Sequence, residues 1–283
     1  MLKGYTLPRT PQGTSSLAPT PPWHYVGTCL AVAYEADPEA VRTFLPPGLE
    51  FDSPKCAAYF VEWQYASNSG EEYLDPVRSQ YRETIFLISA RREGTACAYC
   101  PFIWVDQDVS LMRGLAQGWP KQIGSTWITR TYYLPSKATP VLGPGGKFGA
   151  TLAVKDRRLV EAVVTLREMT PQLPSPNFAR AVNTRHFPEL AAGKHDSPAV
   201  YELVQLKSRD VQISPIWTGE ATLQIFDHPY LELPDLRPAK VTAGYRFACA
   251  LTVDDLITLQ DLRAENEARP GLLDKHNDRL VIE

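Results

Sequence analysis

The sequence predicts a mainly β (α+β) fold, built on a large antiparallel β-sheet with a few added helices. Many segments are rich in Val, Ile, Thr and aromatic residues, which favour strands. Clusters of Pro and Gly separate these segments, and strand patterns do not alternate regularly with helix patterns. A doubly wound parallel sheet or a TIM barrel therefore does not fit. The predicted strands are residues 57–65, 83–91, 95–105, 126–134, 150–156, 159–169, 201–213, 221–226 and 243–253.

The two ends of the chain have different patterns. Residues 1–22 carry repeated prolines among Ser, Thr and Gly, which favours an extended arm, and residues 23–283 then form a single domain. Asp37 is a good N-cap before Pro38, so we expect a short helix that the prolines at 46 and 47 end. Residues 254–268 follow a helical pattern that stops before Pro270, so we expect a longer helix there.

Composition excludes several classes of protein. The 283 residues are 44% hydrophobic and 22% charged, and 29 Lys and Arg stand against 32 Asp and Glu. This balance provides no positive field for a nucleic acid partner. No segment approaches the roughly 20 apolar residues that span a bilayer, and the first residues lack the apolar core of a signal peptide. We therefore expect a cytoplasmic protein with no membrane partner, whose five cysteines are reduced.

The most informative segment is residues 118–124, GWPKQIG, which places Lys121 between a rigid Trp-Pro pair and a glycine. Apolar residues surround Lys121 in the sequence, among them Leu115, Trp119 and Ile123. Burial among such side chains lowers the pKa of a lysine, and a neutral amine attacks ketones. A lysine in an exposed turn, with its stem along the surface, is the alternative interpretation.

Metal chemistry has little support in the sequence. The five histidines are scattered, without the spacings that metal ligands show on a helix or in a turn. We therefore expect no metal.

Four segments resemble, in the same order, motifs of one family. Residues 217–228, WTGEATLQIFDH, are similar to the W-T-G-x-x-x-L-Q-L-F-D-H signature of the acetoacetate decarboxylase family. Residues 118–124 resemble the run around that family's imine-forming lysine. Residues 37–51 resemble its early helix, and residues 175–178 resemble its R-P-N-Y run. The resemblance covers roughly residues 28–253.

The resemblance implies a cone-shaped β-barrel, a homo-oligomer and an imine mechanism in which Lys121 is the nucleophile. It also assigns Glu83, 38 residues before Lys121, to the family's active-site glutamate. A carboxylate beside an iminium can stabilise it or move protons at the neighbouring carbon. The alternative for Glu83 is a salt bridge to a surface arginine such as Arg82 or Arg78.

This chain departs from the family's pattern at three places. Gln122 follows Lys121 where typical decarboxylases have a second lysine, so desolvation alone would have to lower the pKa of Lys121. The arginine expected before the first family strand would fall near Gly27, where the chain has none. A second family glutamate would fall between residues 59 and 63, where Glu62 is the only acid.

Two other residues agree with relatives that condense and dehydrate pyruvate through an imine. In those relatives a glutamine four residues before the lysine and a tyrosine late in the chain assist the chemistry. Gln117 and Tyr245 match these positions. Tyr245 as an ordinary aromatic residue of a sheet is an equally good interpretation.

We therefore expect a cofactor-free lyase that forms an imine with a small keto acid. Lys121 and Glu83 are the expected catalytic residues, and Gln117, Tyr245, Glu62 and Trp119 the expected substrate-binding ones. The preferred reaction is aldol condensation and dehydration of pyruvate with an aldehyde, or its reverse. Decarboxylation of acetoacetate or a related β-keto acid is the alternative, and a non-catalytic small-molecule-binding protein is the second alternative.

Overall fold

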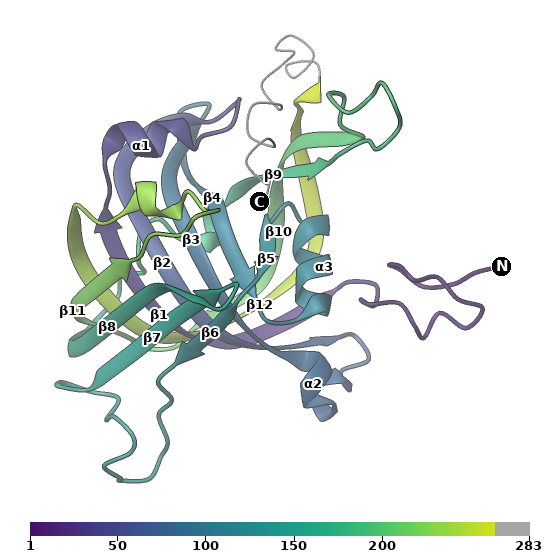
Figure 1. The fold of residues 1–283 in the computed structure, drawn as a ribbon. Helices are drawn as coiled ribbons and strands as arrows, with labels where there is room; N and C mark the ends of the chain where they lie inside the picture. Colours follow the sequence, from purple (N-terminus) through teal and green to yellow (C-terminus); the bar gives the residue numbers. More distant parts are fainter. Residues whose placement is uncertain (264–283) are drawn as a thin grey trace, which may run out of the picture.

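A computed structural model describes residues 1–263, most of which lie in one large sheet (Figure 1). The mainly β fold class is therefore confirmed. In chain order the strands are β1 (Trp23–Glu35), β2 (Glu50–Ser67), β3 (Gln80–Arg92), β4 (Thr95–Val105), β5 (Lys121–Ile123), β6 (Ser125–Ile128), β7 (Lys147–Val154), β8 (Arg157–Thr170), β9 (Val182–Phe187), β10 (Val200–Ile213), β11 (Ile216–Ile225) and β12 (Lys240–Asp261). The helices are α1 (Pro38–Thr43), α2 (Pro76–Ser79) and α3 (Asp108–Ala116), with short 3-10 turns η1 (Glu72–Leu74), η2 (Phe178–Arg180) and η3 (Leu233–Leu236).

The sheet closes on itself. Its strand order is β5-β4-β3-β2-β1-β12-β11-β8-β7-β6, and every pair is antiparallel except the parallel pair β4 and β5. The two ends of this path meet because Gly124 alone joins β5 to β6, and its N–H donates to the carbonyl of Val105 at 2.9 Å. The hydroxyls of Thr84 on β3 and Thr126 on β6 also lie 2.6 Å apart. The closed, curved sheet agrees with the barrel that the resemblance implies.

Strands β1 to β4 are buried on both faces. Side chains alternate along a strand, so Phe60, Phe86 and Trp104 enter the core enclosed by the closed sheet. Their neighbours Tyr59, Leu87 and Ile103 enter a second core on the other face. This second core lies under β10 and β9, which extend the sheet beyond β12. Burial on both faces explains why these strands read as continuous apolar runs rather than as alternating patterns.

One of the two predicted helices forms. Helix α1 begins as expected, because the carboxylate of Asp37 accepts a hydrogen bond from the backbone N–H of Glu39 at 2.8 Å. The helix predicted at residues 254–268 is wrong over residues 254–261, which belong to β12 and pair with β10. That pairing, interrupted by register shifts at Asp254 and Leu259, gives most of the segment partners in the sheet, which overrides its helical pattern. The remainder of the predicted helix beyond Arg263 lies outside the described residues.

Three further differences concern short elements. The strand predicted at residues 126–134 ends at Ile128, and residues 129–134 lie in the loop that leads to β7. Strand β9 and helix α3 were not among the predicted elements. Strand β1, the central partner of β2 and β12, was likewise not among the predicted strands.

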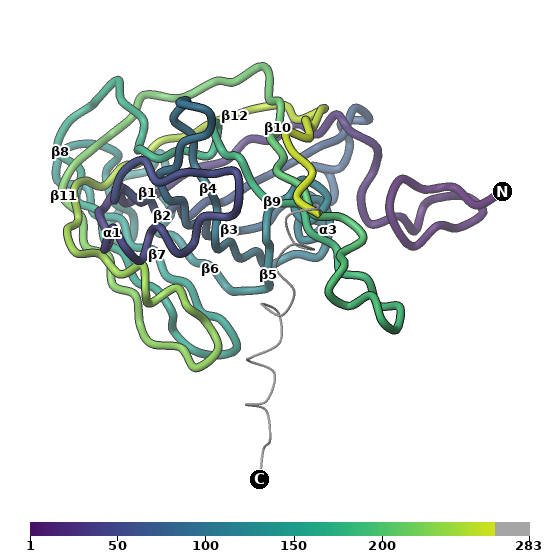
Figure 2. The backbone as a smooth tube through the Cα atoms, turned by 90° about the horizontal axis from the view of Figure 1, so that it is seen from above, coloured from purple at the N-terminus to yellow at the C-terminus, as the bar shows by residue number. Residues whose placement is uncertain are grey.

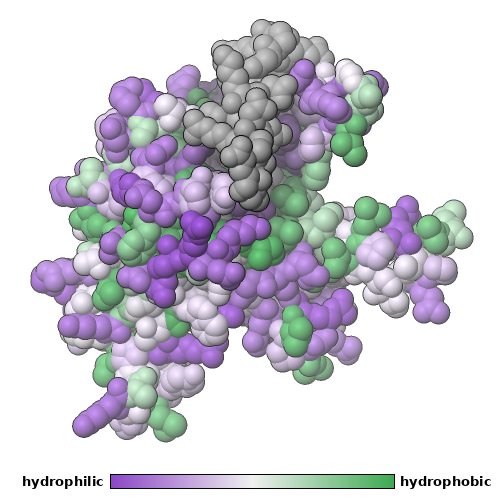
Figure 3. Space-filling model, viewed as in Figure 1, coloured by the Kyte–Doolittle hydropathy of each residue, from purple (hydrophilic) through white to green (hydrophobic). Residues whose placement is uncertain are grey.

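Exposed apolar side chains gather on three projections of the molecule (Figure 3). Residues 1–22 extend away from the sheet in both views of the chain (Figures 1 and 2). The other two projections are the η1–α2 segment, with Leu74 and Val77, and the loop between β6 and β7, with Leu134 and Val141. Such surfaces are typical of protein interfaces and agree with the expected homo-oligomer. The homo-oligomer and the separate arm remain predictions. Within residues 1–263, no helix has the length and apolar character needed to cross a membrane.

Adjacent residues of β3 provide a test of two-sided burial. Phe86 and Leu87 are both fully buried but face opposite cores. We expect Phe86→Ala to lower the free energy of unfolding by about 3–5 kcal/mol and Leu87→Ala by about 2–5 kcal/mol, because each leaves a cavity in a packed core. Chemical denaturation measures both, with Val163→Ala as control, since Val163 on β8 is 46% exposed. A small loss for either core variant would show that one face is not a packed core.

Candidate active site

The turn that carries Lys121 forms because helix α3 ends in a glycine-stabilised cap. Gly118 has φ +83°, in the left-handed region, and donates its N–H to the carbonyl of Leu115 at 3.2 Å. The N–H of Trp119 donates to the carbonyl of Gly114 at 2.9 Å, which completes a Schellman motif. Pro120 cannot continue a helix, so Lys121 begins strand β5 directly beside α3.

The aliphatic stem of Lys121 lies against Gly114 in the middle of α3. A Cβ atom placed on Gly114 would lie 2.1 Å from Cδ and 2.5 Å from Cε of Lys121. Glycine inside a helix costs about 1 kcal/mol relative to alanine. Helix α3 therefore contains a residue that weakens it, and the space left by the absent side chain accommodates the lysine.

Lys121 and Glu83 form a buried ion pair. The Nζ of Lys121 lies 2.6 Å from Oε2 of Glu83, and the two side chains are only 8% and 6% exposed. Nζ also donates a hydrogen bond to the hydroxyl of Ser110 on α3 at 2.9 Å. The ring of Tyr81 completes the surroundings, with its centre 5.4 Å from Nζ. Helix α3 and strand β3 thus hold the amine from two sides.

Trp63 holds the other oxygen of Glu83. Its indole Nε1 donates to Oε1 of Glu83 at 3.1 Å, whereas Oε2 lies in the ion pair with Lys121. The indole lies across Gly27 on β1, where a Cβ atom would come within 2.5 Å of the Trp63 ring. A side chain at position 27 would collide with this ring. Gly27 and Trp63 therefore stand together where the family pattern suggested an arginine.

Burial lowers the pKa of Lys121, which agrees with the sequence prediction. The nearby carboxylate of Glu83 acts in the opposite direction, and the guanidinium of Arg113 lowers this pKa further. The sequence suggested that desolvation alone lowers the pKa of Lys121, but the structure adds the positive charge of Arg113. The positive charge that is missing at Gln122 comes instead from helix α3.

Arg113 is a buried cation in an aromatic cage. Its residue is 2% exposed, and its guanidinium carbon lies 3.4 Å from the ring centre of Tyr65 and 5.4 and 5.7 Å from those of Tyr25 and Tyr81. Within residues 1–263 its nitrogens have no hydrogen-bond partner of good geometry. Tyr25 and Tyr81 also line the cavity next to Lys121, so Arg113 lies directly behind the cavity wall.

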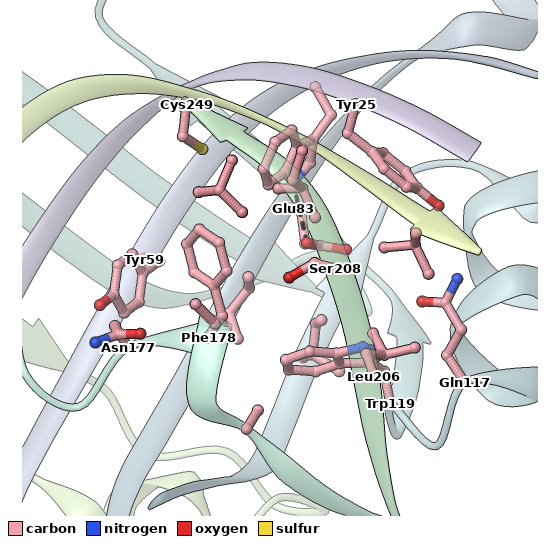
Figure 4. Close-up of a pocket in the computed structure, with 18 of the residues that line it drawn as sticks. Tyr25, Tyr59, Glu83, Gln117, Trp119, Asn177, Phe178, Leu206, Ser208 and Cys249 are labelled. Carbon is pink, nitrogen blue, oxygen red and sulfur yellow. Dashed lines mark hydrogen bonds between the residues drawn. The ribbon is translucent and has the colours of Figure 1, made fainter. Parts of the chain in front are cut away.

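The reactive groups open into a cavity of about 120 Å³. Gln117, Trp119, Lys121 and Glu83 all line it, so the structure brings these four predicted residues together. Figure 4 shows Gln117 and Tyr25 at one end, Glu83 and Trp119 near the middle, and Tyr59, Asn177 and Phe178 toward the other end. Its wall is mostly apolar and comes from β2, β3, β10, β12 and the η2 segment. Such a cavity strengthens electrostatic interactions inside it.

The structure does not bring Glu62 and Tyr245 into the cavity wall. Glu62 follows Val61 on β2 and therefore faces the opposite side, where it pairs with Arg130 at 3.1 Å. Tyr245 on β12 packs against the second core, and burial raises the pKa of its phenol. Gln122 is exposed on β5, on the other side of the strand from Lys121.

Sequence reasoning missed Arg113, Gly114, Ser110 and Trp63. The first three lie on one helix, and their spacing of three and four residues places them on one helical face with Gln117. That periodicity was available in the sequence, but helix α3 was not predicted. The role of Trp63 depends on the pairing of β2 with β1 and β3, which places it beside Gly27 and Tyr81.

No site for a resident metal is evident in the described part of the chain. Residues 1–263 contain no group of three or more His, Cys, Asp or Glu side chains arranged to hold an ion. The polar groups that line the cavity include an amine, a carboxylate, an amide and hydroxyls, which can attack a carbonyl group, transfer protons and donate hydrogen bonds.

Comparison with protein families gives one match over most of the chain. The model of the acetoacetate decarboxylase family matches residues 6–262. Among curated relatives, Acetoacetate decarboxylase 1 of Bradyrhizobium diazoefficiens is 25% identical over 256 residues, which cover 88% of this chain and 90% of that protein.

Solved structures are similar over nearly the same length. The enduracididine biosynthesis enzyme MppR, complexed with the condensation product of pyruvate and imidazole 4-carboxaldehyde, has a TM-score of 0.87 and 40% identity and covers 92% of this chain and 98% of its own. MppR complexed with pyruvate has a TM-score of 0.86, with 40% identity and coverage of 92% and 99%. An acetoacetate decarboxylase-like enzyme from Sphingomonas wittichii RW1 has a TM-score of 0.84 and 25% identity, with coverage of 92% and 100%.

The contact between Gly114 and Lys121 can be tested with one methyl group. We expect Gly114→Ala to slow the reaction of Lys121 with a keto acid by about a hundredfold, because the lysine must move from its position beside Glu83. The measurement is the rate of borohydride-trapped adduct on Lys121, by peptide mass spectrometry. Gly149→Ala is the matched control, since its Cβ would make an ordinary contact of 3.6 Å. Equal rates in the two variants would contradict the role of Gly114.

Substitutions at Arg113 and Glu83 should shift the pKa of Lys121 in opposite directions. Its folded pKa is lowered by burial and by Arg113, so the reactive neutral amine is present at lower pH than for an exposed lysine. Arg113→Met removes a repelling positive charge and should raise the midpoint, whereas Glu83→Gln removes an attracting negative charge and should lower it. Competitive labelling with an amine-selective acylating reagent over a pH series measures each midpoint, with exposed Lys55 as internal control. A Lys121 midpoint equal to that of Lys55 would disprove the shift.

Proposed function

The chain belongs to the acetoacetate decarboxylase family, and from that premise we propose that it is an imine-forming lyase acting on a small keto acid through Lys121. The preferred reaction is aldol condensation of pyruvate with an aldehyde, followed by dehydration, or the reverse of this sequence. The proposal gives Lys121 the role of nucleophile and Glu83 that of acid-base group. Gln117 and Trp119 position the substrate.

The observation that carries the proposal is the buried pair of Lys121 and Glu83 at 2.6 Å in the wall of a mostly apolar cavity. A buried ion pair of this kind contributes little to stability in general, because desolvation offsets its attraction. A catalytic role accounts for the pair better than a stabilising one. The lysine is desolvated for attack, and a carboxylate lies within reach of the protons that the attack releases.

Imine formation is the first step. The neutral amine of Lys121 attacks C2 of the keto acid, the carbonyl oxygen leaves as water after protonation, and a protonated imine remains. Glu83, now released from the ammonium, neutralises the positive charge of the iminium. Ser110, which accepts a hydrogen bond from Nζ at 2.9 Å, keeps the nitrogen at this point of the cavity.

Carbon–carbon bond formation follows from the same intermediate. Glu83 removes a proton from C3, and the electron pair of that C–H bond forms an enamine. The enamine carbon then attacks the aldehyde carbon, and the aldehyde oxygen takes up a proton to become a hydroxyl. Loss of a second C3 proton and of this hydroxyl, as water, gives an unsaturated iminium. Hydrolysis releases the unsaturated keto acid and restores Lys121.

The cavity end beside Gln117 suits the carboxylate of a 2-keto acid. The cation of Arg113 lies behind Tyr25 and Tyr81 at this end, and the side-chain amide of Gln117 lines the wall. Its positive potential favours an anion even without direct contact. The similarity to MppR, which has been solved in complexes with pyruvate and with a pyruvate condensation product, supports a 2-keto acid as the substrate.

Decarboxylation of acetoacetate or a related β-keto acid is the second candidate. Two observations favour it: the curated relatives named acetoacetate decarboxylase, and the apolar wall beyond Glu83. In this reaction the bond from the carboxyl carbon breaks, its electrons neutralise the iminium, and carbon dioxide leaves. An apolar wall favours the change from a charged carboxylate to a neutral product.

Trapping with two keto acids distinguishes these reactions. We expect pyruvate followed by borohydride to add a pyruvate-sized mass to Lys121, and pyruvate with an aldehyde to give an unsaturated keto acid. Lys121→Ala should abolish both, a loss of at least about a thousandfold for removal of a covalent nucleophile. The readouts are peptide mass spectrometry and chromatography of the product, and Lys55→Ala is the matched control.

Each other outcome has a definite meaning. An acetone-sized adduct from acetoacetate, with steady release of carbon dioxide that Lys121→Ala abolishes, would overturn the aldol preference in favour of decarboxylation. No adduct from either keto acid would overturn the proposed imine chemistry of small keto acids. Binding without any adduct would then favour the non-catalytic binding protein.

A further inference from the structure

We infer that the half of the cavity around Tyr59 and Phe178 binds the second reactant, and that this reactant is an aldehyde with an uncharged, apolar side chain. The inference rests on the proposed function, because it assigns the partner that condenses with a keto acid held on Lys121. The direction of the reaction, the charges of the wall and its aromatic surface each contribute to it.

The direction of the reaction places the aldehyde. In the imine of a 2-keto acid, the carboxylate and the reacting C3 atom project from opposite sides of C2. Gln117 and the charge of Arg113 lie at one end of the cavity, so a carboxylate held there directs C3 toward the other end. Figure 4 shows Tyr59, Asn177, Phe178 and Cys249 on that side of Glu83. The aldehyde must approach C3 from this side.

The wall of this half carries no compensating charge. Among the described residues that line the cavity, the side chains charged at neutral pH are Lys121 and Glu83, and these two pair with each other. Burial raises the pKa of the Tyr59 phenol, so this group stays neutral. A charged aldehyde would lose its hydration there without gaining a partner, which costs several kcal/mol in order of magnitude.

The surface of this half is aromatic and aliphatic. The rings of Tyr59 and Phe178 meet edge to face, with centres 5.4 Å apart. The ring centre of Trp63 lies 6.3 Å from that of Phe178 in a second edge-to-face arrangement. The hydroxyl of Tyr59 already donates to the carbonyl of Pro176 at 2.8 Å, so its ring is the part that remains for a ligand. Ile213, which pairs with Cys249 across β10 and β12, extends this surface, and Asn177 adds a neutral polar group.

A series of aldehydes of one shape tests the inference. Benzaldehyde, 4-carboxybenzaldehyde and 4-(trimethylammonio)benzaldehyde share a ring but are neutral, anionic and cationic. With the full chain and constant pyruvate, we expect kcat/KM for benzaldehyde to exceed both others by about tenfold or more, the size of effect that a mismatched pocket produces. Product formation is followed by chromatography and mass spectrometry.

A charge added to the wall sharpens this test. Ile213 lines the cavity and is 38% exposed, so Ile213→Asp can be accommodated at its rim. For this variant we expect the ratio of kcat/KM for the cationic aldehyde to kcat/KM for benzaldehyde to rise by about tenfold. The reason is one new ion pair in a partly desolvated site. Val163→Asp is the matched control, because Val163 is an exposed residue of β8 outside the cavity wall, and it should leave the ratio unchanged.

The outcomes separate this inference from the proposed function. If pyruvate is trapped on Lys121 but charged aldehydes react as well as benzaldehyde, or no aldehyde condenses, the inference is overturned while the imine chemistry stands. If no keto acid is trapped on Lys121, the proposed function itself fails.

Discussion

A lysine held next to a carboxylate in a desolvated wall is the constraint on which the site depends. Bringing the ammonium of Lys121 and the carboxylate of Glu83 out of water is unfavourable unless each charged atom has a well-placed partner. The 2.6 Å contact between them, the indole of Trp63 and the hydroxyl of Ser110 provide those partners. Gly114 gives the lysine stem the space to reach them. Helix α3 and strands β2, β3 and β5 thus each contribute a side chain or a space to this one pair of charges.

The electrostatics of the site combine opposing effects. Burial lowers the pKa of Lys121 and the carboxylate of Glu83 raises it, and the net direction is downward, so the neutral amine forms at lower pH than in an exposed lysine. Arg113 adds a second positive charge without taking a carboxylate away from the site. Aromatic rings surround it, and its nearest ring centre, that of Tyr65, is 3.4 Å away. Helix α3 thus places a second cation near Lys121, and this cation contributes to lowering the pKa of Lys121.

The cavity exists because the central strands are buried on both faces. One face packs the interior of the closed sheet with buried side chains such as Phe86 and Trp104. The other face carries Glu83, Trp63 and Tyr59, and β10 covers it at a distance that leaves space between the two layers. The same strands therefore provide a rigid core on one side and a reactive surface on the other.

Composition and local motifs in the sequence by themselves determined the mainly β class and the helix at Asp37. They also singled out Lys121, Glu83, Gln117 and Trp119, which the structure places in the wall of one cavity. These depend on chemistry that is local, or on short motifs that a resemblance can identify. Tertiary structure alone decided which strands pair and which side chains contact Lys121 and Glu83. The pairing of β12 with β10 overrode a helical pattern at residues 254–261, and alternation along β2 directed Trp63 into the cavity and Glu62 away from it. Arg113 and Gly114 matter through contacts across the fold, which no local pattern contains, because burial and hydrogen-bond geometry exist only once distant segments have packed together.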